Sequence, residues 1–218
     1  MRGLNMHPNA LLNVCAELIQ KMGRLEQPAD AIATRFFREH RNLGPRERAT
    51  VAETAFAVLR RKRCMDWMAR SGVGAPARRL AILGFSGDAG FLQAALTPQE
   101  EAWLRACKVI PAADLPDCCA HNLPDWLVQR LAQQPGLDFA ALAQTLQTPA
   151  DLDLRVNALR FKRADVAQQL VRSGIRTRET PFSPWGLRVE GHPALQRQAL
   201  FVDGAFEVQD EGSQLLAL

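Results

Sequence analysis

The segment Leu152-Asp153-Leu154-Arg155-Val156-Asn157 alternates apolar and polar side chains with a period of two. This alternation is typical of a strand with one buried face. Every periodic segment before Pro149 instead repeats its apolar side chains at helical spacing. The sequence therefore predicts an α+β multidomain protein, in which an all-α part precedes a small α+β part.

The residues after this segment continue the α+β pattern. Gly174 ends a predicted helix over residues 164–173. The Pro181–Gly186 stretch reads as a turn between strands. The strands predicted around and after it cover residues 175–180, 187–190 and 206–208.

The residues before Pro149 predict a series of helices. Asn9 is expected to cap the first helix, which ends at Gly23, and Thr97-Pro98-Gln99-Glu100 has the pattern of a capping box. A single basic helix is expected from about Pro45 to Arg70, with its apolar stripe on Val51, Ala55, Val58 and Leu59. The other predicted helices begin near residues 28, 76, 97, 124 and 138.

Positive charge is concentrated in the N-terminal segment. The 218 residues hold 27 Lys and Arg against 23 Asp and Glu, and residues 1–80 alone hold 15 basic and 7 acidic side chains. Residues 81–150 hold 3 and 7, and residues 151–218 hold 9 and 9. Basic clusters of this kind attract polyanions, although a solvated helix face has the same composition. Phosphate contacts are predicted for Arg60, Arg61, Lys62, Arg63, Arg78 and Arg79.

Several protein classes do not fit the composition. The apolar runs are shorter than a membrane span, and Met1–Pro8 lacks an apolar leader. The five irregularly spaced cysteines suit a reduced, cytoplasmic and monomeric protein without disulfides. A zinc site would need Cys107, Cys118, Cys119 and His121, but adjacent cysteines rarely bind one metal, so no metal is expected.

Three short motifs resemble one enzyme family. Gly204-Ala205-Phe206-Glu207-Val208-Gln209-Asp210-Glu211-Gly212-Ser213-Gln214-Leu215 is similar to the segment that begins the catalytic domain of the Sun family (RsmB type) of RNA cytosine-C5 methyltransferases, with Gly212 in place of the usual Ala. Leu154-Arg155-Val156-Asn157 and Leu123-Pro124-Asp125-Trp126-Leu127 match two upstream motifs of that family in the expected order. The basic helix more weakly resembles the NusB-like domain that precedes them.

The resemblance implies a domain plan. Residues 1–110 would form an all-α NusB-like RNA-binding domain, and residues 111–150 a helical linker. Residues 151–206 would form an RRM-like α+β subdomain, and residues 207–218 would start a Rossmann-like methyltransferase domain that is mostly absent. Arg155 and Asn157 would then contact RNA.

The resemblance also implies the chemistry. In such enzymes a cysteine thiolate adds to carbon 6 of the pyrimidine, which activates carbon 5 toward the methyl group of S-adenosylmethionine. The cofactor loop and the Pro-Cys and Thr-Cys motifs are expected beyond Leu218, so we expect no catalytic residue in these 218 residues and no activity from them alone. The resemblance places Gln209, Asp210 and Ser213 at the edge of the cofactor pocket, because Gln209 and Ser213 would share a helix face.

The predicted function is therefore the RNA-binding, N-terminal region of an S-adenosylmethionine-dependent methyltransferase that acts on RNA, with ribosomal RNA as the expected partner. Two alternatives stay open at this point. One is a non-enzymatic NusB-like RNA-binding adaptor for antitermination, and the other is a protein-interaction module. The sequence does not identify the RNA or the target cytosine.

Overall fold

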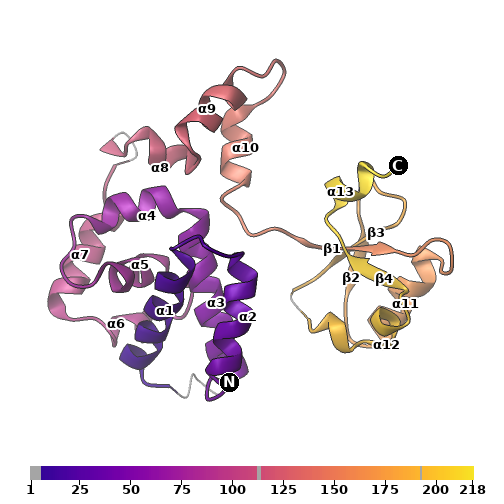
Figure 1. The fold of residues 1–218 in the computed structure, drawn as a ribbon, viewed down its shortest axis with the longest axis horizontal. Coiled ribbons are helices and arrows are strands. Elements are labelled where there is room, and N and C mark those ends of the chain that lie inside the picture. Colours follow the sequence, from indigo (N-terminus) through magenta and orange to yellow (C-terminus); the bar gives the residue numbers. More distant parts are fainter. Residues whose placement is uncertain (1–5, 112–113, 192) are drawn as a thin grey trace. The chain divides into compact units, whose positions relative to one another are not determined.

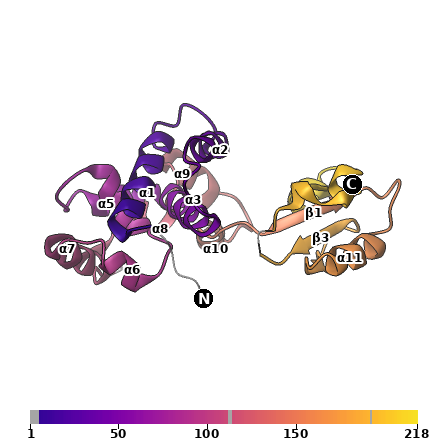
Figure 2. The ribbon, with the colours of Figure 1, turned by 90° about the horizontal axis from the view of Figure 1, so that it is seen from below.

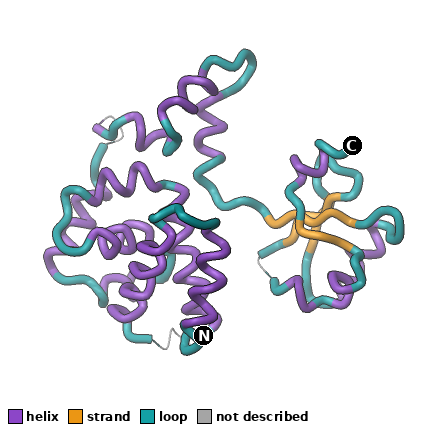
Figure 3. The backbone as a smooth tube through the Cα atoms, in the orientation of Figure 1, coloured by secondary structure: helices purple, strands orange, loops and turns teal. Residues whose placement is uncertain are grey.

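The computed structural model describes residues 6–111, 114–191 and 193–218. It divides the chain into two compact units between Thr148 and Pro149. Helices make up the first unit, and the strands that the model describes all lie in the second (Figure 3). The expected α+β multidomain architecture is confirmed at this level. Residues 1–5 of the stretch examined for a leader lie outside the described part.

Helices of the first unit pack around α1, which contacts α2, α3, α5 and α6 (Figure 1). Five buried side chains of α1 have at most 1% exposure, because apolar residues recur on the faces that its neighbours cover. The helices are α1 (Pro8–Met22), α2 (Ala29–Glu39), α3 (Pro45–Arg60), α4 (Lys62–Ala69), α5 (Pro76–Gly84), α6 (Ala89–Gln93), α7 (Pro98–Lys108), α8 (Asp117–His121), α9 (Asp125–Ala132) and α10 (Phe139–Thr145).

Two predictions about these helices are wrong. His7, not Asn9, is the N-cap of α1, since Pro8 takes the first helical position and the Asn9 side chain instead accepts a hydrogen bond from Arg78. The expected helix from Pro45 to Arg70 is two helices. Arg61 leaves the helical region (φ −118°, ψ 29°), and α4 runs on to pack against α5 and α8.

Other predictions about the first unit are confirmed. Thr97 and Glu100 form the capping box of α7. Val51, Ala55 and Val58 are buried in the core of this unit. The predicted bounds of the linker stay a prediction; residues 114–148 belong to the first unit, where α8 packs against α4 and α10 packs against α8.

The second unit is a four-stranded antiparallel sheet with the strand order β2-β3-β1-β4. Along the chain its elements are β1 (Leu152–Val156), α11 (Arg163–Arg172), β2 (Thr177–Glu179), β3 (Gly186–Val189), η2 (Leu195–Arg197), α12 (Ala199–Val202), β4 (Phe206–Val208) and α13 (Glu211–Leu215). This is a βαββαβ arrangement, in which α11 and α13 lie on opposite faces of the sheet (Figure 2).

One face of this sheet is apolar and the other is polar. Leu154, Leu187 and Phe206 are buried on the face that packs against α11. The strand register places Asp153, Arg155, Arg188 and Glu207 on the opposite face. The expected alternation of β1 is correct for side-chain direction but wrong for exposure: Asp153 is 4% exposed, because Arg188 covers it.

No helix among the described residues is both long and apolar enough to cross a lipid bilayer.

Candidate nucleic-acid interface

The basic run Arg60–Arg63 crosses the break between α3 and α4. Arg60 is partly exposed and Arg61 is exposed, and neither side chain makes a hydrogen bond or ion pair with any described residue. Lys62 forms an ion pair of 2.5 Å with Asp66, one turn further along α4. The bend at Arg61 thus leaves two guanidinium groups available to an external anion, out of the four basic side chains in this run.

Arg63 has a structural role instead. Its guanidinium donates to the backbone carbonyl of Leu123 and to Asp125, at 2.7 Å from the carboxylate. The hydrogen bond from Arg63 lowers the pKa of Asp125. Asn122 supports the same junction, since its side chain accepts from the N–H of Cys64 and donates to Gln147. These bonds fasten the segment before α9 to the helical unit.

Arg78 is also committed to intramolecular bonds. Its guanidinium contacts both carboxylate oxygens of Glu100, at 2.5 and 3.1 Å, and donates to Asn9, Asn13 and the carbonyl of Ala95. The side chains of Arg78 and Glu100 are only 20% and 15% exposed. The hydrogen bond from Arg78 lowers the pKa of Glu100 to about 2. Arg78 therefore joins α1, α5 and α7.

Arg79, the next residue, also bonds to other parts of the protein. It donates to the carbonyl oxygens of Ala69 and Gly72, at 2.6 and 2.5 Å, and so closes the end of α4. Together, Arg78 and Arg79 contribute positive charge to the unit, but their donors point inward.

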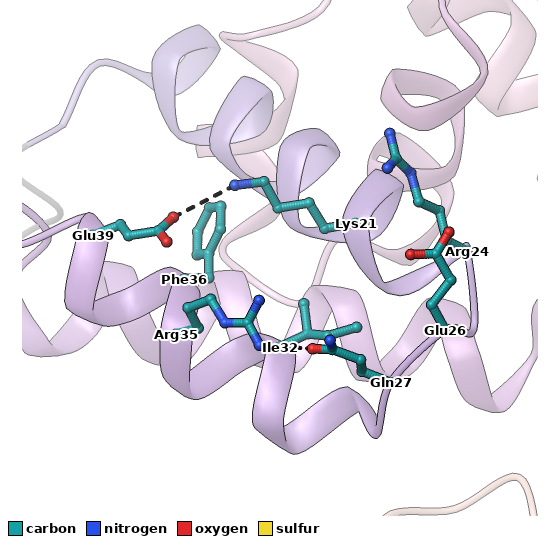
Figure 4. A pocket seen from close by; sticks show the side chains of 8 residues that line it. All are labelled: Lys21, Arg24, Glu26, Gln27, Ile32, Arg35, Phe36 and Glu39. Atoms are coloured by element: carbon teal, nitrogen blue, oxygen red, sulfur yellow. Dashed lines mark hydrogen bonds and ion pairs between the residues drawn. The ribbon is translucent and has the colours of Figure 1, made fainter.

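A hollow between α1 and α2 carries further charged groups (Figure 4). Lys21 is paired with Glu17 at 3.1 Å and Glu39 at 3.6 Å, and lies 5.2 Å from the ring centre of Phe36. Arg35 donates to Gln27. Since acidic and amide groups already occupy most of these cations, this hollow is a weaker anion site than Arg60 and Arg61.

The residues weighed as zinc ligands lie among packed side chains. No cluster of three or more His, Cys, Asp or Glu side chains suited to a metal is found within the described ranges. Burial, followed by the neighbouring Cys64 thiol, raises the pKa of Cys119 to about 12. The His121 ring lies tilted against the Phe139 ring, with 4.7 Å between the ring centres. These residues pack α8 against its neighbours.

The polar face of the sheet has a hollow of 520 Å³ at the end of β1, which Arg155, Asn157 and Trp185 line together with Leu159 and Glu207. The Arg155 guanidinium lies 5.9 Å from the ring centre of Trp185 and contacts Glu207 at 3.5 Å. Asn157 donates to the carbonyl of Gly204 across the hollow. The structure therefore brings together the two candidate residues predicted on β1.

Sequence reasoning missed Trp185, which was assigned only to a turn. The register continues beyond Gly186, so that the backbone of Trp185 pairs with Val156, and the Trp185 ring comes within 5.9 Å of the Arg155 guanidinium. The available signal was an aromatic residue directly before a strand, but the pairing of that strand with β1 could not be read from the local sequence.

The cofactor-pocket edge predicted from Gln209, Asp210 and Ser213 stays a prediction, but one of its premises is wrong. Gln209 precedes the N-cap Asp210 of α13, so it shares no helix face with Ser213. Asp210 accepts from both the N–H and the hydroxyl of Ser213, as expected for a helix start, and the Gln209 side chain accepts from Arg155. The polar groups of these three residues therefore already have partners, Arg155 for Gln209 and each other for Asp210 and Ser213.

Glu211, the first residue of α13, has more partners than an exposed acid at a helix start needs. The structure shows it 6% exposed, with one carboxylate oxygen accepting from the N–H groups of Phe182 and Ser183 at 2.7 and 2.8 Å. Burial opposes ionisation, yet these two backbone donors lower the pKa of Glu211 below its ordinary value. Buried Gln214 accepts from the Ser183 hydroxyl and donates to Leu154. α13 thereby fastens the turn that carries Trp185.

Residues 123–196 match a family model described as the ferredoxin-like domain of RsmF/B-like methyltransferases. The match begins just before α9 and includes β1, α11, β2 and β3. The βαββαβ order of the second unit is the arrangement of a ferredoxin-like fold. These matched residues are therefore similar to the ferredoxin-like domain of RsmF/B-like methyltransferases, and β4 lies beyond them.

Two individual proteins extend the comparison. The chain is 32% identical over 99 residues to the probable ribosomal RNA small subunit methyltransferase B of Synechocystis sp., an alignment that covers 44% of this chain and 22% of that protein. The crystal structure of PH0851 covers 97% of this chain with a TM-score of 0.65 and 14% identity, and the match spans 55% of that chain. At this identity the second likeness concerns the fold alone.

The chain thus spans less than two thirds of the length of either relative. Taken with the family model, these findings confirm the resemblance to the Sun/RsmB-type family.

Proposed function

We propose that this chain positions RNA for an S-adenosylmethionine-dependent RNA cytosine-C5 methyltransferase, with ribosomal RNA as the substrate. The observation that carries the proposal is the match of residues 123–196 to a domain of RsmF/B-like methyltransferases. The relative named as a ribosomal RNA methyltransferase supports the substrate class. In this proposal the non-enzymatic adaptor is the alternative that the experiments must exclude.

RNA placement depends on cations that face outward. Arg60 and Arg61 are available, whereas Arg63, Arg78 and Arg79 are occupied by carbonyl and carboxylate groups of the protein. Arginine suits this task because its planar guanidinium can form two parallel hydrogen bonds to one phosphate. We therefore propose that only Arg60 and Arg61, rather than the whole run from Arg60 to Arg63, contact RNA phosphates.

Methyl transfer would need a thiolate nucleophile and a bound methyl donor. Cys15, Cys64, Cys107 and Cys119 are buried, and burial raises the pKa of Cys15 to about 12. Such thiols are inert structural groups. S-adenosylmethionine would supply the methyl group when bound, and we assign its binding and the nucleophile to parts of the protein other than the residues described here.

Salt-dependent RNA binding tests the placement role. Arg60→Ala/Arg61→Ala should flatten the dependence of log K on log salt by roughly 0.7–0.9 units per lost phosphate contact. The matched control is Arg172→Ala/Arg197→Ala, which removes two exposed arginines from the second unit, where acidic and basic residues are equal in number. Titrations of a labelled ribosomal RNA hairpin at several salt concentrations would measure both slopes. Equal slopes for the two variants would contradict the proposed interface.

Methylation itself is tested in cells. Bisulfite sequencing of ribosomal RNA should lose one protected cytosine when the gene is deleted and regain it when the gene is restored. Calorimetry of the 218-residue chain with S-adenosylmethionine should show no micromolar binding. An unchanged bisulfite pattern would favour the adaptor.

A further inference from the structure

The hollow on the polar face of the sheet has a size and an apolar border that a phosphate site does not need. Its volume of 520 Å³ falls within the range of small-ligand sites, roughly 300–1,000 Å³. Leu159 lies at its border with 97% of its surface exposed, so apolar surface there is left uncovered. Trp185 is half-buried, and its indole N–H makes no hydrogen bond with the described residues.

The two planar groups of the hollow are held in place before any ligand arrives. The backbone of Trp185 accepts from the N–H of Val156 at 2.9 Å, and its own N–H donates to the Ser183 hydroxyl at 3.3 Å. Arg155 is held from the other side by Glu207 and Gln209. An aromatic ring and a guanidinium fixed near each other form a platform on which a flat, π-rich ligand can stack.

The polar groups around this platform suit the edge of a base. The Asn157 amide group, the Arg155 guanidinium and the Glu207 carboxylate offer both donors and acceptors at the border of the hollow. Glu207 is 63% exposed in its side chain, so it can accept from a base amino group without a large desolvation cost. An acidic group at this position disfavours a phosphate, and therefore selects the base rather than the backbone.

We propose that this hollow binds one unpaired RNA base, stacked on Trp185 and Arg155 and contacted at its edge by Asn157 and Glu207. The proposal rests on the proposed function, because that function makes RNA the ligand. It assigns a different task to each unit: Arg60 and Arg61 bind phosphates of any RNA, while the hollow requires a base that is not in a duplex. A single-stranded or looped segment of the substrate is the expected occupant.

The test compares an unpaired uridine octanucleotide with an RNA duplex of the same length, both labelled for anisotropy. Trp185→Ala should weaken octanucleotide binding by about fivefold to about 150-fold, the range for one base stacked on an aromatic ring. The slope against salt should stay unchanged, since no phosphate contact is lost. Trp126→Ala, at a tryptophan of α9 that is 63% exposed, is the control and should bind like the unmodified chain.

A second pair of variants tests the same hollow by substituting exposed side chains only. Leu159→Glu places a negative charge at the border and should weaken octanucleotide binding, whereas Leu216→Glu makes the same change at a residue of α13's end that is 92% exposed and should not. Both sites are exposed, so both variants should fold. This pair decides the question if Trp185→Ala fails to fold.

The outcomes separate the two proposals. Loss of octanucleotide affinity in Trp185→Ala and Leu159→Glu, with duplex affinity retained, supports the base-binding hollow. Unchanged octanucleotide affinity in Leu159→Glu, or an equal loss for duplex and octanucleotide, overturns it even if Arg60→Ala/Arg61→Ala still flattens the salt slope. If the unmodified chain binds neither RNA, the proposed function fails as well.

Discussion

The Arg78–Glu100 pair gives a prediction that separates a structural arginine from an RNA-binding one. Glu100→Gln removes the negative charge and keeps the capping box, because glutamine can also bond back to the N-cap backbone. The pKa of Glu100 lies at about 2 against an ordinary 4.5. A pKa difference of that size corresponds to about 3 kcal/mol of unfolding free energy at pH 7. Both side chains are mostly buried, so solvent screens their interaction little.

The sign of the pH dependence follows from the lowered pKa. A carboxylate whose pKa is lower in the folded state stabilises the protein above the unfolded pKa and loses this effect as the pH falls toward the folded pKa. The difference between the unmodified chain and Glu100→Gln should therefore be constant above about pH 5. It should fall to about half by pH 3.

Urea unfolding of the helical unit at pH 7, 5, 4 and 3, followed by circular dichroism, measures this difference. Glu101→Gln is the matched control on the same helix, since Glu101 is 33% exposed and its ion pair with Arg105 is long, at 3.7 Å. Its effect should stay within about 0.5 kcal/mol. A Glu100→Gln effect below that value, or one that is equal at pH 7 and pH 3, would refute the structural role of Arg78.

Three further predictions concern the packing of both units. Gly186→Ala should destabilise the second unit by about 1–3 kcal/mol in thermal unfolding, because a Cβ there would lie 1.9 Å from the Thr180 hydroxyl oxygen; an unchanged transition would contradict the strand geometry. Glu211→Ala should leave two backbone donors unpaired and speed hydrogen exchange at Phe182 and Ser183, whereas Asp203→Ala should not. At pH 8, Cys118 should react with a thiol reagent before buried Cys15 and Cys119, since thiols with a pKa of about 12 are almost entirely protonated there; equal rates would be inconsistent with the burial of Cys15 and Cys119.

Local patterns predicted much of the fold. The capping box at Thr97 and the strand at Leu152–Val156 could be predicted because each depends on neighbours within a few residues. The break between the helices at Arg61 could not be predicted, because no glycine or proline marks it and α4 packs against α5 and α8, which are distant in sequence. The same holds for buried Asp153, whose partner Arg188 lies 35 residues further along the chain.

The candidate interface was predicted less completely, for a related reason. The composition of a basic run does not show which guanidinium groups find internal acceptors, and Arg63, Arg78 and Arg79 do so over separations of 7 to 69 residues. Trp185 became a candidate only through strand pairing. For the basic run and for the hollow, the sequence predicted the chemistry of single residues but not their partners at long range.

Each of the two units closes its own hydrophobic core, one around α1 and the other between the sheet and α11. Among the described residues, neither core includes a side chain of the other unit, so a recombination point in the gene before Pro149 would leave each hydrophobic core intact. Recombination there could therefore exchange the helical half for another module and keep the βαββαβ half unchanged. The same property allows each half to be produced and labelled separately for spectroscopy.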